Sequence, residues 1–255
     1  MSVDLVVRGA LVPNVDLVVF DKDGTLIDVH TYWANMICFR AEAIVSRLDL
    51  GSVERNGIMD AMGVDIETGR IKPEGPVGIK KREVVLRAGV DYLISQGQSD
   101  MTALFEEVFQ HVDEISMEHL DDIILPLNGL APLLGRLHEG GCLIALATTD
   151  RSYRAAAVME YLGLNDKIAL VAGADMVEKP KPDPEIIHLI CQHLGVPPGK
   201  SIMVGDSSSD IKAGLNAGCL ASIAVTSGLT PQDKLEELTS HVIPDISAIE
   251  VRFSR

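Results

Sequence analysis

The 255-residue chain contains few aromatic residues, few cysteines and comparatively little positive charge. Aromatic side chains make up 4% of the sequence while hydrophobic residues reach 47%, so its core must be mainly aliphatic. This composition argues against a disordered chain and is typical of parallel sheets flanked by helices. The four cysteines are scattered, without the paired spacing of a zinc site. We therefore expect reduced core thiols and a cytoplasmic location.

Lysine and arginine, 22 together, are outnumbered by 37 aspartates and glutamates, which gives a formal charge of −15. Such an excess disfavours nucleic acid and anionic membranes as partners. No apolar run is long enough to cross a bilayer, and the start, Met1-Ser2-Val3-Asp4, lacks the pattern of a signal peptide. A phosphorylated ligand would be repelled at long range, so a site for one needs local positive charge. The sequence does not specify an oligomeric state.

What the chain does have is a series of short apolar runs, each suited to a buried strand. These runs cover 17–20, 143–147, 169–171, 201–204 and 221–225. Stretches with helical spacing separate the later ones, at 151–161, 184–194 and 209–217. This alternation predicts right-handed βαβ crossovers and an α/β fold with a parallel sheet. Residues 1–14 suggest a small strand or hairpin before the first core strand.

The segment from 28 to 126 has no strand pattern. Helical spacing dominates it, over 31–48, 54–62, 78–95 and 100–115. We therefore predict a helical insert at 28–126 within an α/β core made of 1–27 and 127–255. If it lies over the ends of the strands, a mobile insert would act as a lid that excludes water during a reaction and admits it later.

The run that ends at Phe20 is followed at once by Asp21-Lys22-Asp23-Gly24-Thr25. In open α/β sheets, ligands bind beyond the carboxyl ends of the strands. Burying carboxylates there without partners would cost roughly several kcal/mol. We therefore predict that these acids belong to a functional site. The run 143–147 ends in Thr148-Thr149-Asp150. The Thr148 hydroxyl could bind a phosphate oxygen beside the next helix start, although a helix N-cap is an alternative.

Two further segments carry charge. In Lys179-Pro180-Lys181-Pro182 the prolines fix the backbone, and a lysine there would neutralise a phosphoryl group. The alternative is a solvated loop. The run ending at Gly205 is followed by Asp206, which is well placed to bind a hard cation, and by Asp210 four residues later. Asp210 could orient water or Lys179, or it could simply favour a helix start.

In this order, the four segments resemble the four motifs of the haloacid dehalogenase-like (HAD) superfamily. The insert resembles the helical cap of its phosphoglycolate phosphatase-like and β-phosphoglucomutase-like members. The resemblance implies a Rossmann-like parallel sheet with an inserted cap, and an enzyme that is a phosphoric monoester hydrolase.

For catalysis, the resemblance implies that Asp21 is the nucleophile and forms an aspartyl-phosphate. Asp23 is the general acid and then the base that activates water. The dehalogenases of the family lack this second aspartate, because a halide leaves without a proton. Asp23 therefore indicates a phosphate ester or anhydride as the substrate.

For binding, the resemblance implies a Mg²⁺ ion held by the carboxylate of Asp21, the backbone carbonyl of Asp23, and Asp206. Asp210 would contact these ligands without binding the ion itself. Lys179 and Thr148 complete the implied catalytic set and hold the phosphoryl oxygens of the substrate. Thr149 and, at the start of the lid, His30 are also expected to bind the substrate. Packing within the lid is the alternative for His30.

We expect a Mg²⁺-dependent phosphatase acting on a small phosphorylated metabolite. A phosphomutase of the β-phosphoglucomutase type, an inorganic pyrophosphatase and a non-catalytic binding protein with this fold are the alternatives. The sequence leaves the substrate open.

Overall fold

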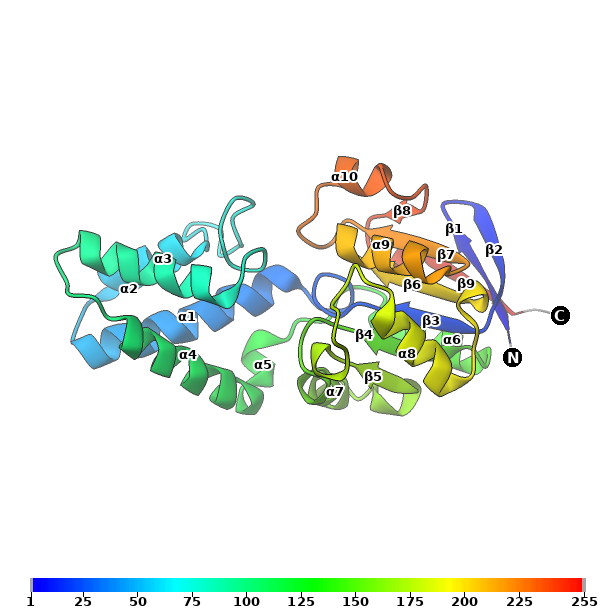
Figure 1. Ribbon diagram of the computed structural model, residues 1–255, viewed down its shortest axis with the longest axis horizontal. Coiled ribbons are helices and arrows are strands. Elements are labelled where there is room, and N and C mark those ends of the chain that lie inside the picture. Colours follow the sequence, from blue (N-terminus) through cyan, green and yellow to red (C-terminus); the bar gives the residue numbers. More distant parts are fainter. Residues whose placement is uncertain (1, 254–255) are drawn as a thin grey trace. The chain divides into compact units, whose positions relative to one another are not determined.

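The computed structural model describes residues 2–253, and the chain forms two compact units (Figure 1). One unit combines the chain up to Asp28 with the chain from Pro126 onward. The other is Val29–Leu125. The chain therefore leaves the first unit once, between 28 and 29, and returns once, between 125 and 126.

The first unit is built on a six-stranded parallel sheet with strand order β5-β4-β3-β6-β7-β8. Its strands are β3 (Leu17–Phe20), β4 (Leu143–Ala147), β5 (Leu170–Ala172), β6 (Ser201–Gly205), β7 (Ala221–Val225) and β8 (Val242–Ile243). The predicted α/β class is thus confirmed, with β5 one residue later than expected. The two-residue β8 is too short to give an apolar pattern and was missed.

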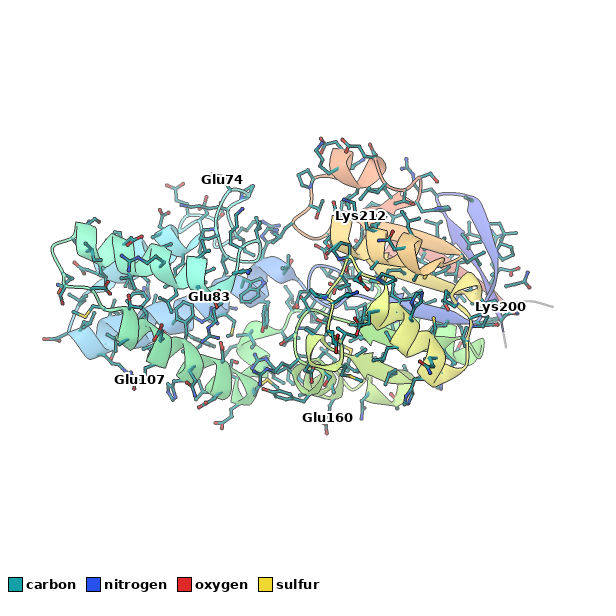
Figure 2. The ribbon with its side chains drawn as sticks, viewed as in Figure 1. Glu74, Glu83, Glu107, Glu160, Lys200 and Lys212 are labelled. Atoms are coloured by element: carbon teal, nitrogen blue, oxygen red, sulfur yellow. The ribbon has the colours of Figure 1, made fainter. Side chains whose placement is uncertain are left out.

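The α-helices of this unit are α6 (Leu130–Glu139), α7 (Ser152–Tyr161), α8 (Glu185–Leu194), α9 (Ser208–Ala217) and α10 (Gln232–Glu236). Helices α8 and α9 lie on the same face of the sheet (Figure 1). Ile187 and Ile190 of α8 and Ala213 of α9 pack there against Val19 and Met203. These side chains are aliphatic, as the composition required. Charged residues such as Glu160 of α7 lie on the outside (Figure 2).

A second, antiparallel sheet of three strands has the order β2-β1-β9. Strands β1 (Val3–Val7) and β2 (Ala10–Val15) form the hairpin that residues 1–14 suggested. Strand β9 (Ile249–Phe253) pairs with β1 from near the other end of the chain. The hairpin is a local structure, whereas its partner β9 pairs with β1 over a separation that runs from Val7–Ile249 to Val3–Phe253, and no local pattern predicts this pairing.

The register of the parallel strands decides where the functional segments meet. Phe20 of β3 is paired with Leu146 on one side and with Val204 on the other. Because the strands are parallel and end together, the residues that follow them share one edge of the sheet. Asp21, Thr148 and Asp206 therefore emerge side by side.

The second unit is entirely helical within its named elements. These are α1 (Val29–Leu48), α2 (Ser52–Met62), α3 (Arg82–Ser95), α4 (Thr102–Ile115), a 3₁₀ turn (Ser116–Glu118) and the short α5 (Leu120–Ile123). Helix α3 starts four residues later than predicted, because Gly78 adopts a left-handed conformation, φ +76°, in a turn that follows Pro76. No helix within 2–253 has both the length and the apolar character needed to cross a membrane.

The core of the helical unit contains a charge. Arg40 of α1 is 4% exposed, and its guanidinium group lies 4.2 Å from the ring centre of Phe109 and 2.7 Å from an Asp113 carboxylate oxygen. Arg82, at the start of α3, also contacts Asp113 and Phe109. Asp113 therefore joins helices α1, α3 and α4 through two arginines.

Candidate active site

Three buried carboxylates meet at the carboxyl edge of the sheet. Asp21 follows β3, Asp206 follows β6 and Asp210 lies in the first turn of α9. Asp21 and Asp206 are each 7% exposed and Asp210 is 1% exposed. One carboxylate oxygen from each lies within 4.8 Å of the others. So close a group of buried negative charges requires cations nearby.

One cation is supplied by Lys181. Its ammonium Nζ lies 2.7 Å from Asp21 Oδ1 and 2.5 Å from Asp210 Oδ1, and it also donates a hydrogen bond to the Ala147 carbonyl at 2.7 Å. All three donor positions of the ammonium group are therefore used. Lys181 ties together the ends of β3 and β4 and the start of α9.

This arrangement corrects the expectation for Lys179, whose side chain is exposed while that of Lys181 is buried. The cause lies in the loop before α8. The Glu185 carboxylate accepts hydrogen bonds from the backbone N–H groups of Glu178 and Lys179, at 2.9 and 3.0 Å. The loop is thereby fixed so that the second lysine of Lys-Pro-Lys-Pro enters the site. Both lysines precede a proline, so the motif alone did not distinguish them.

The pKa values of these groups reflect burial and mutual repulsion. Burial raises the pKa of Asp21 from 3.8 to about 7; Lys181 opposes this rise, and Asp210 and Asp23 add to it. Burial, with repulsion from Asp21 and Asp210, also raises the pKa of Asp206 well above its ordinary value. Burial alone would lower the pKa of Lys181, but Asp21 and Asp210 raise it above its usual value. Lys181 therefore stays charged, while Asp21 and Asp206 lack sufficient neutralisation.

The donor set of the cluster fits a divalent cation. Asp210 is fully engaged, since its Oδ1 binds Lys181 and its Oδ2 accepts hydrogen bonds from the Ser207 amide and hydroxyl groups. Within residues 2–253, no hydrogen bond reaches Oδ2 of Asp21 or Oδ1 of Asp206. Three carboxylates and one ammonium group carry a formal charge of −2. Two free carboxylate oxygens with that charge match the oxygen-rich, partly hydrated coordination of Mg²⁺.

Asp206 is held by a loop that the sequence analysis did not single out. The Leu229 amide donates a hydrogen bond to Asp206 Oδ2 at 3.3 Å, and the Ser227 hydroxyl donates one to the Gly24 carbonyl at 2.6 Å. Between them, Gly228 lies so close to Asp206 that a Cβ atom added there would be 1.8 Å from Oδ2. Only glycine fits this position. The loop after β7 therefore fixes both Asp206 and the turn after β3.

Asp23 lies beside the cluster, with a side chain that is 21% exposed. Its Oδ1 accepts a hydrogen bond from the ammonium group of Lys22 at 2.9 Å. Lys22 is completely buried and also contacts Asp150 Oδ2 at 3.3 Å. Neither Lys22 nor Asp150 was predicted as a site residue. The signal was present in the sequence, because a lysine between two acids at a buried strand end needs partners.

Of the two threonines after β4, Thr148 is buried and Thr149 is exposed. Thr148 Oγ1 accepts a hydrogen bond from the Asp150 amide at 3.0 Å, and Arg151, not Thr148, occupies the N-cap of α7. The N-cap alternative is therefore wrong for Thr148. Its hydroxyl proton is still available for a ligand oxygen at the edge of the sheet.

His30 belongs to the helical unit, in the first turn of α1, where its Nδ1 accepts a hydrogen bond from the Ile71 amide at 3.3 Å. This contact ties α1 to the loop between α2 and α3. It supports the packing alternative for His30, and a contact with substrate stays a prediction.

The sequence model of the haloacid dehalogenase-like hydrolase family matches residues 15–218. The chain belongs to this family. The matched span includes β3, β4 and β6 with the site residues that follow them, and it contains the whole helical unit.

The relatives of the chain in this family include enzymes named as phosphatases, in line with the expected phosphoric monoester hydrolase. A phosphoglycolate phosphatase from Chromobacterium violaceum is 29% identical over 234 residues, which cover 91% of this chain and 95% of that protein. Among solved structures, a HAD-superfamily hydrolase of subfamily IA from Geobacter sulfurreducens superimposes with a TM-score of 0.62 at 19% identity, covering 92% of this chain and 94% of that one. A β-phosphoglucomutase from Clostridium difficile gives 0.57 at 19% identity, covering 91% and 92%. At these identities the structures show the shared fold alone.

Proposed function

We propose that this HAD-family hydrolase is a Mg²⁺-dependent phosphatase that hydrolyses a small phosphorylated metabolite through an aspartyl-phosphate on Asp21. The observation that carries the proposal is the buried contact of Lys181 with Asp21 and Asp210, beside the free oxygens of Asp21 and Asp206. An anionic nucleophile can approach an anionic phosphate only where fixed positive charge offsets the repulsion.

The chemistry has two displacements. In the first, the Asp21 carboxylate attacks phosphorus, and the bond between phosphorus and the leaving oxygen breaks as Asp23 gives that oxygen a proton. In the second, Asp23 takes a proton from water, the water oxygen attacks phosphorus, and the bond to Asp21 breaks. Inorganic phosphate and an alcohol are the products.

The other residues bind and orient. Lys181 offsets the charge of the phosphoryl oxygens, and the Thr148 hydroxyl donates to one of them. Asp210 positions Lys181 through their 2.5 Å contact. Asp21, Asp206 and the Asp23 carbonyl would hold Mg²⁺, which supplies charge neutralisation for the transferred group. Since specificity in a shared fold comes from its variable parts, the helical unit would select the substrate.

The test is a panel of phosphate esters with Mg²⁺ that includes phosphoglycolate, hexose phosphates and pyrophosphate. Wild type is compared with Asp21→Asn, which should lower kcat/KM at least about a thousandfold. Asp16→Asn is the matched control, because Asp16 lies at the opposite end of β3 and pairs with the exposed Lys200. Rates for Asp21→Asn close to wild type, or no activity of the wild type on any ester, would refute the proposal.

Product analysis separates the related reactions. A phosphatase releases inorganic phosphate, a mutase converts one hexose phosphate into its isomer, and a pyrophosphatase acts on pyrophosphate alone. Removal of Mg²⁺ by a chelator should abolish the release of phosphate, and added Mg²⁺ should restore it. Chelator-resistant activity would exclude the metal-dependent mechanism.

A further inference from the structure

Lys22 is a buried lysine that the proposed chemistry does not yet use. It stands between the two acids of the first motif, and its side chain is 0% exposed. An unpaired ammonium group at such a position would lose its hydration without compensation. The positions of the carboxylates that contact its ammonium group therefore indicate the role of Lys22.

The ammonium group bridges two loops. Asp23 Oδ1, on the loop after β3, lies at 2.9 Å, and Asp150 Oδ2, on the loop after β4, lies at 3.3 Å. Asp150 is itself fixed from the other side, because its Oδ1 accepts a hydrogen bond from the Arg151 amide at 2.8 Å and lies 3.5 Å from Arg154 Nε. Lys22 is thus anchored at the start of α7 and reaches Asp23 from there.

The backbone of Lys22 reinforces this arrangement. Its carbonyl accepts hydrogen bonds from the amides of Leu26 and Ile27, at 2.9 and 3.1 Å, which closes the turn that carries Asp23. The backbone thus fixes the turn, and the ammonium group fixes the orientation of the Asp23 side chain within it.

The Asp23 carboxyl group has one oxygen engaged and one available. Oδ1 binds Lys22, and within residues 2–253 no hydrogen bond reaches Oδ2. Proton transfer requires the acid to lie within hydrogen-bond reach of the leaving oxygen, in a defined direction. Holding one oxygen by a buried cation leaves the other to carry the proton.

We propose that Lys22 is a positioning residue for Asp23, which aims the free oxygen of that carboxyl group at the leaving group of the substrate. The proposal rests on the proposed function, since it assumes that Asp23 is the acid. A purely structural role, in which Lys22 only joins the loops after β3 and β4, makes different predictions.

The decisive measurement is kcat/KM for Lys22→Met with two classes of ester. An alkyl phosphate needs a proton on its leaving oxygen, whereas an aryl phosphate such as p-nitrophenyl phosphate leaves as a stable anion. Because kcat/KM reports the first irreversible step, it isolates the departure of this group. We expect a loss at least about tenfold larger for the alkyl ester than for the aryl ester. Equal losses for both classes would overturn the proposal.

A double-mutant cycle provides the second readout. If Lys22 acts through Asp23, then Lys22→Met should change the alkyl-ester rate by less than about threefold in an Asp23→Asn background, because coupled residues are not additive. If the loss in the double variant instead equals the product of the losses in the two single variants, Lys22 acts independently of Asp23. Lys212→Met, on the exposed side of α9 (Figure 2), is the matched control for a lost lysine.

Two further results keep the test decisive. If Lys22→Met does not fold, Asp150→Asn replaces it. This variant keeps the lysine but removes its anchor, and kcat/KM should again fall more for the alkyl ester than for the aryl ester, by a smaller factor than in Lys22→Met. A crystal structure of whichever variant folds supplies a readout without turnover, and an Asp23 carboxyl group in its wild-type position would refute positioning. Wild type that is inactive on every ester would instead reject the proposed function itself.

Discussion

Replacing Lys181 by methionine is the perturbation with the largest effect that the structure predicts. Methionine has a similar length and no charge, so it removes the ammonium group while filling much of its space. The lost contacts are those at 2.7 Å to Asp21 and 2.5 Å to Asp210, between side chains that are at most 10% exposed. Removing one partner from a buried ion pair costs about 3–5 kcal/mol, because the remaining charge has no compensation. In a protein of this size that corresponds to a decrease in Tm of about 6–20 °C.

The loss should depend on pH in a definite direction. The native pKa of Asp21 is already raised to about 7, so its carboxyl group binds a proton more tightly when folded than when unfolded. The free energy of unfolding therefore decreases as the pH rises from about 4 through 7. Without Lys181 the carboxylates repel one another more strongly, so we expect a larger loss at pH 8 than at pH 5.

The assay is thermal unfolding by circular dichroism in EDTA at pH 5 and pH 8, with Lys179→Met as the matched control. Lys179 is exposed and two residues away, and its replacement should change the free energy of unfolding by less than about 0.5 kcal/mol. An equal Tm for Lys181→Met and wild type at pH 8 would contradict this prediction. A larger decrease in Tm for Lys179→Met than for Lys181→Met would also contradict it.

Three further outcomes follow from the same cluster. For metal-free wild type, the raised pKa values of Asp21 and Asp206 predict that Tm decreases as the pH rises from 5 to 8. Added Mg²⁺ should raise Tm more at pH 8 than at pH 5. A Tm that does not change with pH in EDTA would contradict this. Gly228→Ala should weaken Mg²⁺ binding at least about tenfold in calorimetry, because the added Cβ would be 1.8 Å from Asp206 Oδ2. An unchanged affinity would show that the loop moves to accommodate the Cβ atom without displacing Asp206. The control is Gly135→Ala inside α6, where an added Cβ would have no atom within 4 Å. This substitution should stabilise the protein by up to about 1 kcal/mol in urea unfolding and leave the Mg²⁺ affinity unchanged. Destabilisation by Gly135→Ala would contradict the open space found beside this residue.

The amino-acid sequence alone determined the class of the fold and the acids of the site. Apolar runs such as 17–20 and 143–147 are long enough, and different enough from the helical stretches between them, to define parallel strands. Asp21 and Asp206 could be named because the end of a buried strand is a position where a carboxylate needs a function. These features are local, so a local pattern records them.

The tertiary structure decided which charged side chains meet. Lys179 and Lys181 stand in the same sequence context, and only the anchoring of their loop by Glu185 brings the second lysine to Asp21, 160 residues away in sequence. The same holds for Lys22 with Asp150, and for Gly228 against Asp206. In each case the partner lies on a different strand or loop. The pairing depends on the register of the sheet and on the volume available beside a buried carboxylate, and no local pattern encodes either one.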